Sequence, residues 1–121
     1  MKQYFLGNWS DKEEVVRDFQ IDVSEFDTAK ILLAWYGYGD YDGSAFVLFE
    51  RSGKLYEAHG GHCSCFGLEG QWDPEEVTVS ELERRITKGD LGKNSYYNES
   101  MFVDEIKELL MLYKQRQARK S

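Results

Sequence analysis

Three apolar runs separated by short turns constrain the fold of this chain most strongly. Residues 30–38, 45–50 and 55–58 are rich in aliphatic and aromatic side chains, as β-strands usually are. Residues 39–44 supply Gly and Asp for one turn, and residues 51–54 form a tighter one. The pattern predicts an antiparallel meander sheet of three to four strands.

The first run is apolar on both of its sides. Neither face of the sheet can therefore be fully exposed to solvent, so we expect helices on one face and loops or a partner on the other. Simple alternation places Ile31, Leu33 and Trp35 on one face and Leu32, Ala34, Tyr36 and Tyr38 on the opposite face.

One short helix is predicted before the strands in the sequence, and a second one after them. Ser10 and Glu13 form a capping box for a helix over residues 11–19, with Trp9 as a hydrophobic staple. Thr78 and Glu81 repeat the capping box, and Gly89 closes the second helix.

A third, longer helix is predicted near the C-terminus. Its basic end suits the negative end of the helix dipole. The expected fold is one α+β domain over residues 1–121, with the sheet packed against this helix. Its core-facing stripe recurs at helical spacing through Phe102, Ile106, Leu109, Leu110 and Tyr113.

Length and composition favour a cytoplasmic protein. A chain of 121 residues is long enough for one hydrophobic core, and 15% aromatic residues supply much of its area. No apolar run is long enough to cross a bilayer, and no secretory leader opens the sequence. We therefore expect a cytoplasmic location and no membrane partner.

The acidic charge is unevenly distributed. The net charge is −7, but four basic residues follow Tyr113, and without them eleven basic residues face twenty-two acidic ones. A body near −11 disfavours direct binding of nucleic acid and favours a protein with a basic surface. The alternative is that the acids keep a small domain soluble.

A glycine-rich segment, residues 60–72, contains both cysteines. With His59, the residues His62, Cys63 and Cys65 supply four side chains of the kind that bind zinc. They lie within seven positions rather than on two separated knuckles, so an ordered loop with reduced, structural cysteines is favoured. Zinc binding and a thiol nucleophile assisted by a histidine remain the alternatives.

Acidic and aromatic residues on two predicted loops form the expected binding surface. No complete catalytic constellation is present, so we expect a protein that is not an enzyme and needs no cofactor. Tyrosines 36, 38, 41, 56, 96 and 97 are expected to be exposed together with Trp72. The alternative is that the tyrosines line the sheet and point their hydroxyls at solvent. The predicted partner-binding residues are Asp40, Tyr41, Asp42, Glu69, Trp72, Asp73, Glu75 and Glu76.

Four segments resemble small uncharacterised proteins carried by bacteriophages and prophages. They are AFVLFE at residues 45–50, GKLYE at 53–57, GHCSC at 61–65 and GLEGQW at 67–72. The resemblance covers roughly residues 29–86 and brings no catalytic residues with it. It implies a protein that inhibits a host defence or nucleic-acid-processing machine, for example a CRISPR effector or a nuclease, in the host cytoplasm if the gene is phage-borne.

Overall fold

The computed structural model describes residues 3–38, 42–63, 67–89, 91, 93–94, 99–100 and 102–120. The chain divides into two compact units, Gln3–Glu76 and Val77–Ser121 together with Met1–Lys2. The single domain expected from the sequence stays a prediction.

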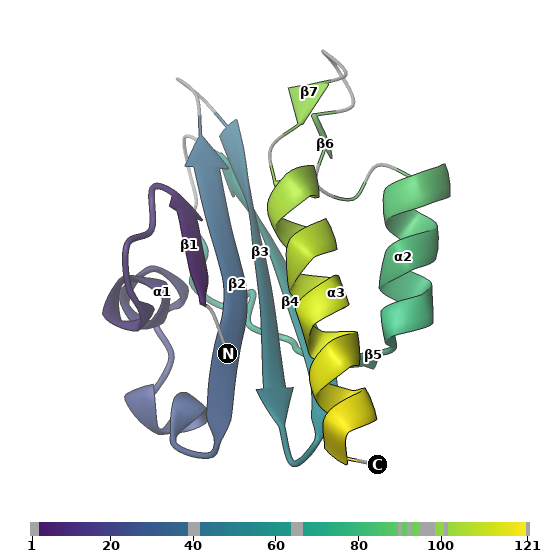
Figure 1. Cartoon of the computed structure of the whole chain (residues 1–121). Helices are drawn as coiled ribbons and strands as arrows, with labels where there is room; N and C mark the ends of the chain where they lie inside the picture. Colours follow the sequence, from purple (N-terminus) through teal and green to yellow (C-terminus); the bar gives the residue numbers. More distant parts are fainter. Residues whose placement is uncertain are drawn as a thin grey trace. The chain divides into compact units, whose positions relative to one another are not determined.

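The Gln3–Glu76 unit holds most of a five-stranded mixed sheet (Figure 1). Its strands follow the order β1-β2-β3-β4-β5, with β1 parallel to β2 and antiparallel pairs between β2, β3 and β4. The α+β class is confirmed, but a purely antiparallel sheet of three to four strands is wrong. The strands are β1 (Tyr4–Gly7), β2 (Ala29–Tyr38), β3 (Asp42–Arg51), β4 (Lys54–Cys63) and β5 (Glu75–Val77).

The crossover from β1 to β2 explains the mixed sheet. Parallel neighbours need a long connection, usually helical. Helix α1 (Lys12–Phe19) and the short 3-10 helix η1 (Val23–Phe26) provide it. The first helix begins within one residue of the predicted start, but its N-cap is Asp11, whose side chain accepts from the Glu14 N–H, rather than Ser10.

The turn between β3 and β4 is the predicted tight hairpin. Ser52 and Gly53 have φ of 54° and 78°, as both central residues of a type I′ turn must. From this turn β4 continues five residues beyond the predicted end at Ala58. Residues 60–63 are therefore strand rather than loop.

A β-bulge at Leu32 reverses the predicted faces of β2. Ile31 pairs with Phe49 and Leu33 pairs with Leu48, so Leu32 is the extra residue. After the bulge, Ala34 and Tyr36 share the core cluster with Ile31. The alternation expected from the sequence is wrong because a single inserted residue moves every later side chain to the other face.

The core of the Gln3–Glu76 unit contains a cluster of packed aromatic rings. Trp9 lies 5.9 Å from Phe19, and Phe26 meets Phe49 edge-on at 5.8 Å, both as centroid separations. All four side chains are almost fully buried. Such tilted and edge-on pairs are the favoured geometries for aromatic packing.

The second unit is mainly helical. Helix α2 (Val79–Lys88) begins at Thr78, whose Oγ1 accepts from the Glu81 N–H at 3.1 Å, and ends at Gly89, as predicted. The strands β6 (Lys93–Asn94) and β7 (Glu99–Ser100) form a small hairpin-like pair before α3 (Val103–Lys120). The predicted stripe is buried, at Phe102, Ile106, Leu109, Leu110 and Tyr113.

Candidate binding surface

Residues 67–76 form the segment that carries most of the predicted binding residues. It opens with a turn in which the Gln71 N–H donates to the Leu68 carbonyl at 3.1 Å. Gly70 occupies this turn with φ of 79°, a conformation that glycine adopts without strain. The segment then leads directly into β5.

Two side chains fix this segment to the core. Leu68 is 1% exposed, and Trp72 stacks on Phe49 with ring centroids 5.7 Å apart and an interplanar angle of 17°. The Trp72 indole N–H donates to Glu25 Oε1 at 3.1 Å. Trp72 thus has a structural part in the fold, whereas its part in partner binding stays a prediction.

Gln71 ties the same segment to β4. Its side-chain N–H groups donate to the carbonyls of Gly61 and Gly67, each at 2.7 Å. Its Oε1 accepts from the Gly61 N–H at 2.8 Å. A side-chain amide therefore pairs with the strand backbone as a neighbouring strand would, and holds the turn beside Gly61.

The exposed acids of this segment form a strip rather than a patch. We call Glu69, Asp73, Glu75 and Glu76 the acidic strip, and all are exposed. Glu69 belongs to the turn held beside Gly61, whereas Glu76 lies 3.9 Å from the Lys54 ammonium at the other end of β4. Seven residues of extended strand separate these ends, about 23 Å at 3.3 Å per residue.

The other predicted binding residues are only partly described. Asp42 begins β3 and pairs with Cys63 in the register of the sheet. This places the start of β3 at the same end of the sheet as Gly61. Asp40 and Tyr41 lie outside the described residues, as do tyrosines 96 and 97 and the side chain of Tyr38.

The tyrosines whose side chains are described do not support the predicted surplus of exposed tyrosines. Tyr36 is 6% exposed and packs against Trp9 with centroids 5.1 Å apart, so its predicted exposure is wrong. The reason is that Trp9, which follows the parallel strand β1, covers Tyr36. Tyr56 is half-buried and stacks on Phe49 at 5.6 Å.

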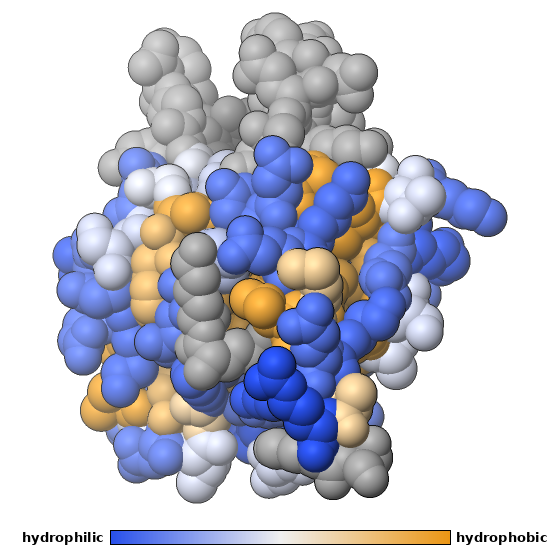
Figure 2. All heavy atoms as spheres, in the orientation of Figure 1, coloured by the Kyte–Doolittle hydropathy of each residue, from blue (hydrophilic) through white to orange (hydrophobic). Residues whose placement is uncertain are grey.

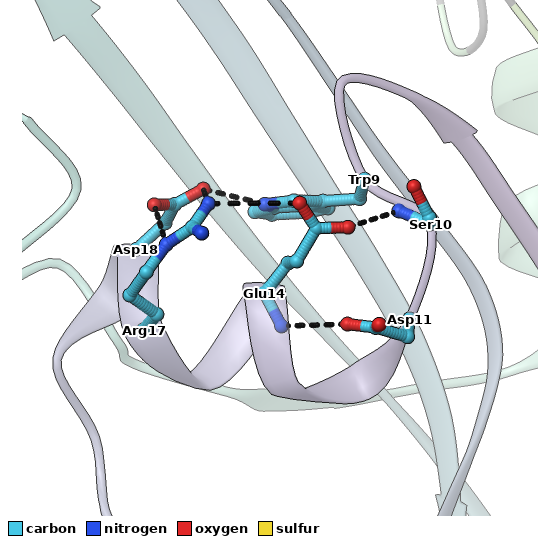
Figure 3. Close-up of polar contacts among 6 residues, drawn as sticks. All are labelled: Trp9, Ser10, Asp11, Glu14, Arg17 and Asp18. Carbon is cyan, nitrogen blue, oxygen red and sulfur yellow. Dashed lines mark hydrogen bonds and ion pairs between the residues drawn. The ribbon is translucent and has the colours of Figure 1, made fainter.

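A network of polar contacts organises α1 beside this surface (Figure 3). The Trp9 indole N–H donates to Asp18 Oδ2 at 2.8 Å, and Arg17 Nε donates to Asp18 Oδ1 at 3.1 Å. Glu14 accepts from the Ser10 N–H at 2.7 Å. The hydrogen bond to Asp18, with its charge, raises the pKa of Arg17 above its ordinary value.

The first part of the histidine and cysteine cluster, from His59 to Cys63, continues strand β4. His59 Nε2 lies 2.5 Å from Glu57 Oε1, and its ring meets Phe46 edge-on at 5.1 Å. The side chains of His62 and Cys63 and all of Cys65 lie outside the description. Within the part that is described, no group of three His, Cys, Asp or Glu side chains is placed to hold a metal ion.

Glu57 is the residue that the sequence reasoning missed. Its side chain is 11% exposed, unusual for a carboxylate. The sequence pattern that could have revealed this residue is its i, i+2 spacing from His59, because such spacing places two side chains on the same face of a strand. The pair is a histidine oriented by a carboxylate.

The surface drawn in Figure 2 is mostly hydrophilic, with hydrophobic atoms in small groups. The large hydrophobic side chains that are exposed in the described residues are Val23 and Met111, each at 51%. Isolated apolar residues of this kind are normal for protein surfaces. Among the described helices, none combines the length and the hydropathy that a bilayer crossing requires.

Searches of protein-family models, of curated proteins and of solved structures find no significant match to this chain. Its function therefore has to be inferred from its own residues.

Proposed function

We propose that this chain is a small acidic binding protein that inhibits a host defence or nucleic-acid-processing machine by occupying a basic surface. It acts stoichiometrically and turns over no substrate. The partner is a protein rather than nucleic acid, because fifteen acidic residues against five basic ones give the Gln3–Glu76 unit a net charge of −10. Such a unit repels a phosphate backbone.

The acidic strip along β4 is the observation that supports this function most directly. Its carboxylates project from a segment that Leu68, Gln71 and Trp72 hold against the core. A segment held in place before binding loses little conformational freedom when a partner arrives. An array of like charges about 20 Å long also attracts an oppositely charged partner from a distance.

The partner class follows from the charge and from the resemblance to phage-borne proteins. Nucleases and CRISPR effectors bind the nucleic-acid backbone in grooves lined by Lys and Arg. The acidic strip presents carboxylates that can take the place of the phosphates in such a groove. Occupying the groove blocks the nucleic acid by competition.

Affinity capture from host lysate tests this function. The double variant Asp73→Lys/Glu75→Lys removes the middle of the acidic strip, and the control Glu13→Lys/Asp27→Lys makes the same charge change at exposed positions elsewhere in the unit. We expect wild type and control to retain one host protein in equimolar amount and the strip variant to lose it. Retention by the strip variant, or turnover of a small substrate by catalytic amounts of the chain, contradicts the proposal.

The Glu57–His59 hydrogen bond supports a second candidate, a zinc- or thiol-dependent protein centred on His59, His62, Cys63 and Cys65. A carboxylate that orients an imidazole is a common arrangement around metals and nucleophiles. Elemental analysis of the purified protein tests it. Stoichiometric zinc that is lost together with folding on chelation would favour this candidate, and zinc-free folded protein removes its metal form.

A further inference from the structure

A pocket of about 490 Å³ opens beside the acidic strip, within the Gln3–Glu76 unit. It lies between the C-terminal end of α1, the turn after β1 and the turn that carries Glu69. Its volume is within the range of about 300–1,000 Å³ that small-ligand pockets occupy. None of the contacts described above fills it.

The cation that lines this pocket is already neutralised. Arg17 bonds to Asp18 and lies 3.7 Å from Glu14 Oε2. Asp18 in turn accepts hydrogen bonds from Arg17 and from the Trp9 indole (Figure 3). Both of its carboxylate oxygens therefore already have a donor. The pocket therefore gains little positive character from Arg17.

Glu69 supplies the available negative charge. Its Oε1 accepts a long hydrogen bond of 3.3 Å from the Gly67 N–H, and its side chain is exposed. Of the described basic side chains in this unit, none lies within ion-pairing distance of its carboxylate. A carboxylate in this state is free to accept two parallel hydrogen bonds from a planar cation.

Neutral groups complete the lining. Asn8 and Gln20 present side-chain amides, and neither amide bonds to another described residue. Amide oxygens accept hydrogen bonds from N–H donors. The buried side chains of Leu68 and Tyr36 add apolar surface beside them, suited to a methylene chain.

We propose that this pocket receives an arginine side chain of the partner, with its guanidinium on Glu69 and the amide oxygens of Asn8 and Gln20. The proposal rests on the proposed function, because it names the group by which a basic partner engages the acidic surface. Arginine fits better than lysine, since the planar guanidinium offers several donors in fixed directions to several separate acceptors. A lysine ammonium is a compact charge that these spread acceptors match less well.

Titration with small probes tests the pocket without any partner protein. The probes are N-acetyl-arginine amide, its uncharged analogue N-acetyl-citrulline amide and N-acetyl-lysine amide. The Trp9 indole N–H reports on the pocket through Asp18, and the Trp72 indole N–H, bonded to Glu25, serves as an internal reference in the same NMR spectrum. We expect saturable shifts of the Trp9 signal with the arginine probe, much weaker ones with lysine and none with citrulline.

Two variants sharpen this titration. Glu69→Gln should weaken arginine binding about tenfold, the usual loss for a charged hydrogen bond, while Glu13→Gln should leave it unchanged. Gln20→Gly removes one amide and keeps the left-handed backbone at φ 55°, so it should weaken binding without unfolding.

The results also separate this inference from the proposed function. Absence of a saturable Trp9 shift, equal shifts with citrulline or lysine, or full affinity in Glu69→Gln each overturns the arginine pocket. If arginine binding fails while the strip variant still loses its host protein, only the pocket is wrong. If the pocket binds arginine while the strip variant keeps its host protein, the acidic-strip function is wrong.

Discussion

The two compact units of this chain have opposite charge and different cores. Gln3–Glu76 has a net charge of −10, whereas Met1–Lys2 with Val77–Ser121 has seven acidic and ten basic residues and a net charge of +3. The overall value of −7 hides this difference. The proposal of a basic partner therefore rests on the charge of the first unit alone.

The hydrophobic cores of the two units also differ. Beside its aliphatic residues the first unit packs a cluster of rings, among them Phe19, Phe49 and Trp72. The second unit buries mainly aliphatic residues such as Leu82, Ile106 and Leu109. Aromatic pairs prefer particular relative orientations, and each buries a large area. This is the packing that holds the acidic strip.

Removal of α3 is expected to have the largest effect. A chain that ends before Met101 loses several buried large side chains, among them Phe102 and Ile106, and each such loss from a core costs about 2–5 kcal/mol. We expect a much lower melting temperature, measured by circular dichroism, with Met111→Ala as an exposed control. An unchanged melting temperature would contradict the prediction that the chain is one domain packed against this helix.

Replacement of Trp72 tests the ring-packed core. Trp72→Ala removes contacts with Phe19, Phe26 and Phe49, and should lower the free energy of unfolding by about 3 kcal/mol. Trp72→Phe keeps a ring and should recover part of this loss. Urea denaturation measures both, and a loss below about 1 kcal/mol for the alanine variant would show that Trp72 is not structural.

The helix caps offer a smaller, matched comparison between the units. Thr78→Ala removes the cap of α2 and Asp11→Ala removes the cap of α1. Each should lower the free energy of unfolding by about 1 kcal/mol, because an N-terminal N–H loses its acceptor. Unchanged stability by urea denaturation in either variant would show that its helix does not depend on the cap.

The smallest expected effect concerns pH. The Ser24 N–H donates to the Asp22 carboxylate and lowers the pKa of Asp22 below its ordinary value of 3.8. A lowered folded-state pKa contributes stability above the unfolded pKa, and this contribution is lost as pH falls. Wild type should therefore melt slightly above Asp22→Asn at pH 7, and this advantage should shrink as pH falls below 3.8. An advantage that stays constant as pH falls through this range would contradict the prediction.

Local sequence signals predicted much of the fold. The apolar runs at β2 and β3, the hairpin turn at Ser52, the cap at Thr78 and the stripe on α3 are features that short stretches encode. The parallel strand β1 was missed because four residues carry little periodic signal and pair only with a distant segment. The bulge at Leu32 was missed because its cause lies in the register with β3.

The candidate surface was predicted in part. Acidity along residues 69–76 is visible in the sequence, but its spread along β4 depends on the Gln71 contacts with Gly61 and Gly67. The pocket joins Asn8, Gln20 and Glu69 from three separate segments, and no local pattern reports such a meeting. The burial of Tyr36 was missed because Trp9, which covers it, follows β1, a strand that was also missed.

The rate constant for association with the captured host protein, measured against salt concentration, tests the central claim most directly. Wild type and the Glu13→Lys/Asp27→Lys control should associate fast at low salt and slow steeply as salt rises. The Asp73→Lys/Glu75→Lys variant should associate about tenfold or more slowly at low salt, because steering by charge is lost where the partner docks. Equal rates for the three proteins, or rates independent of salt, would contradict the account.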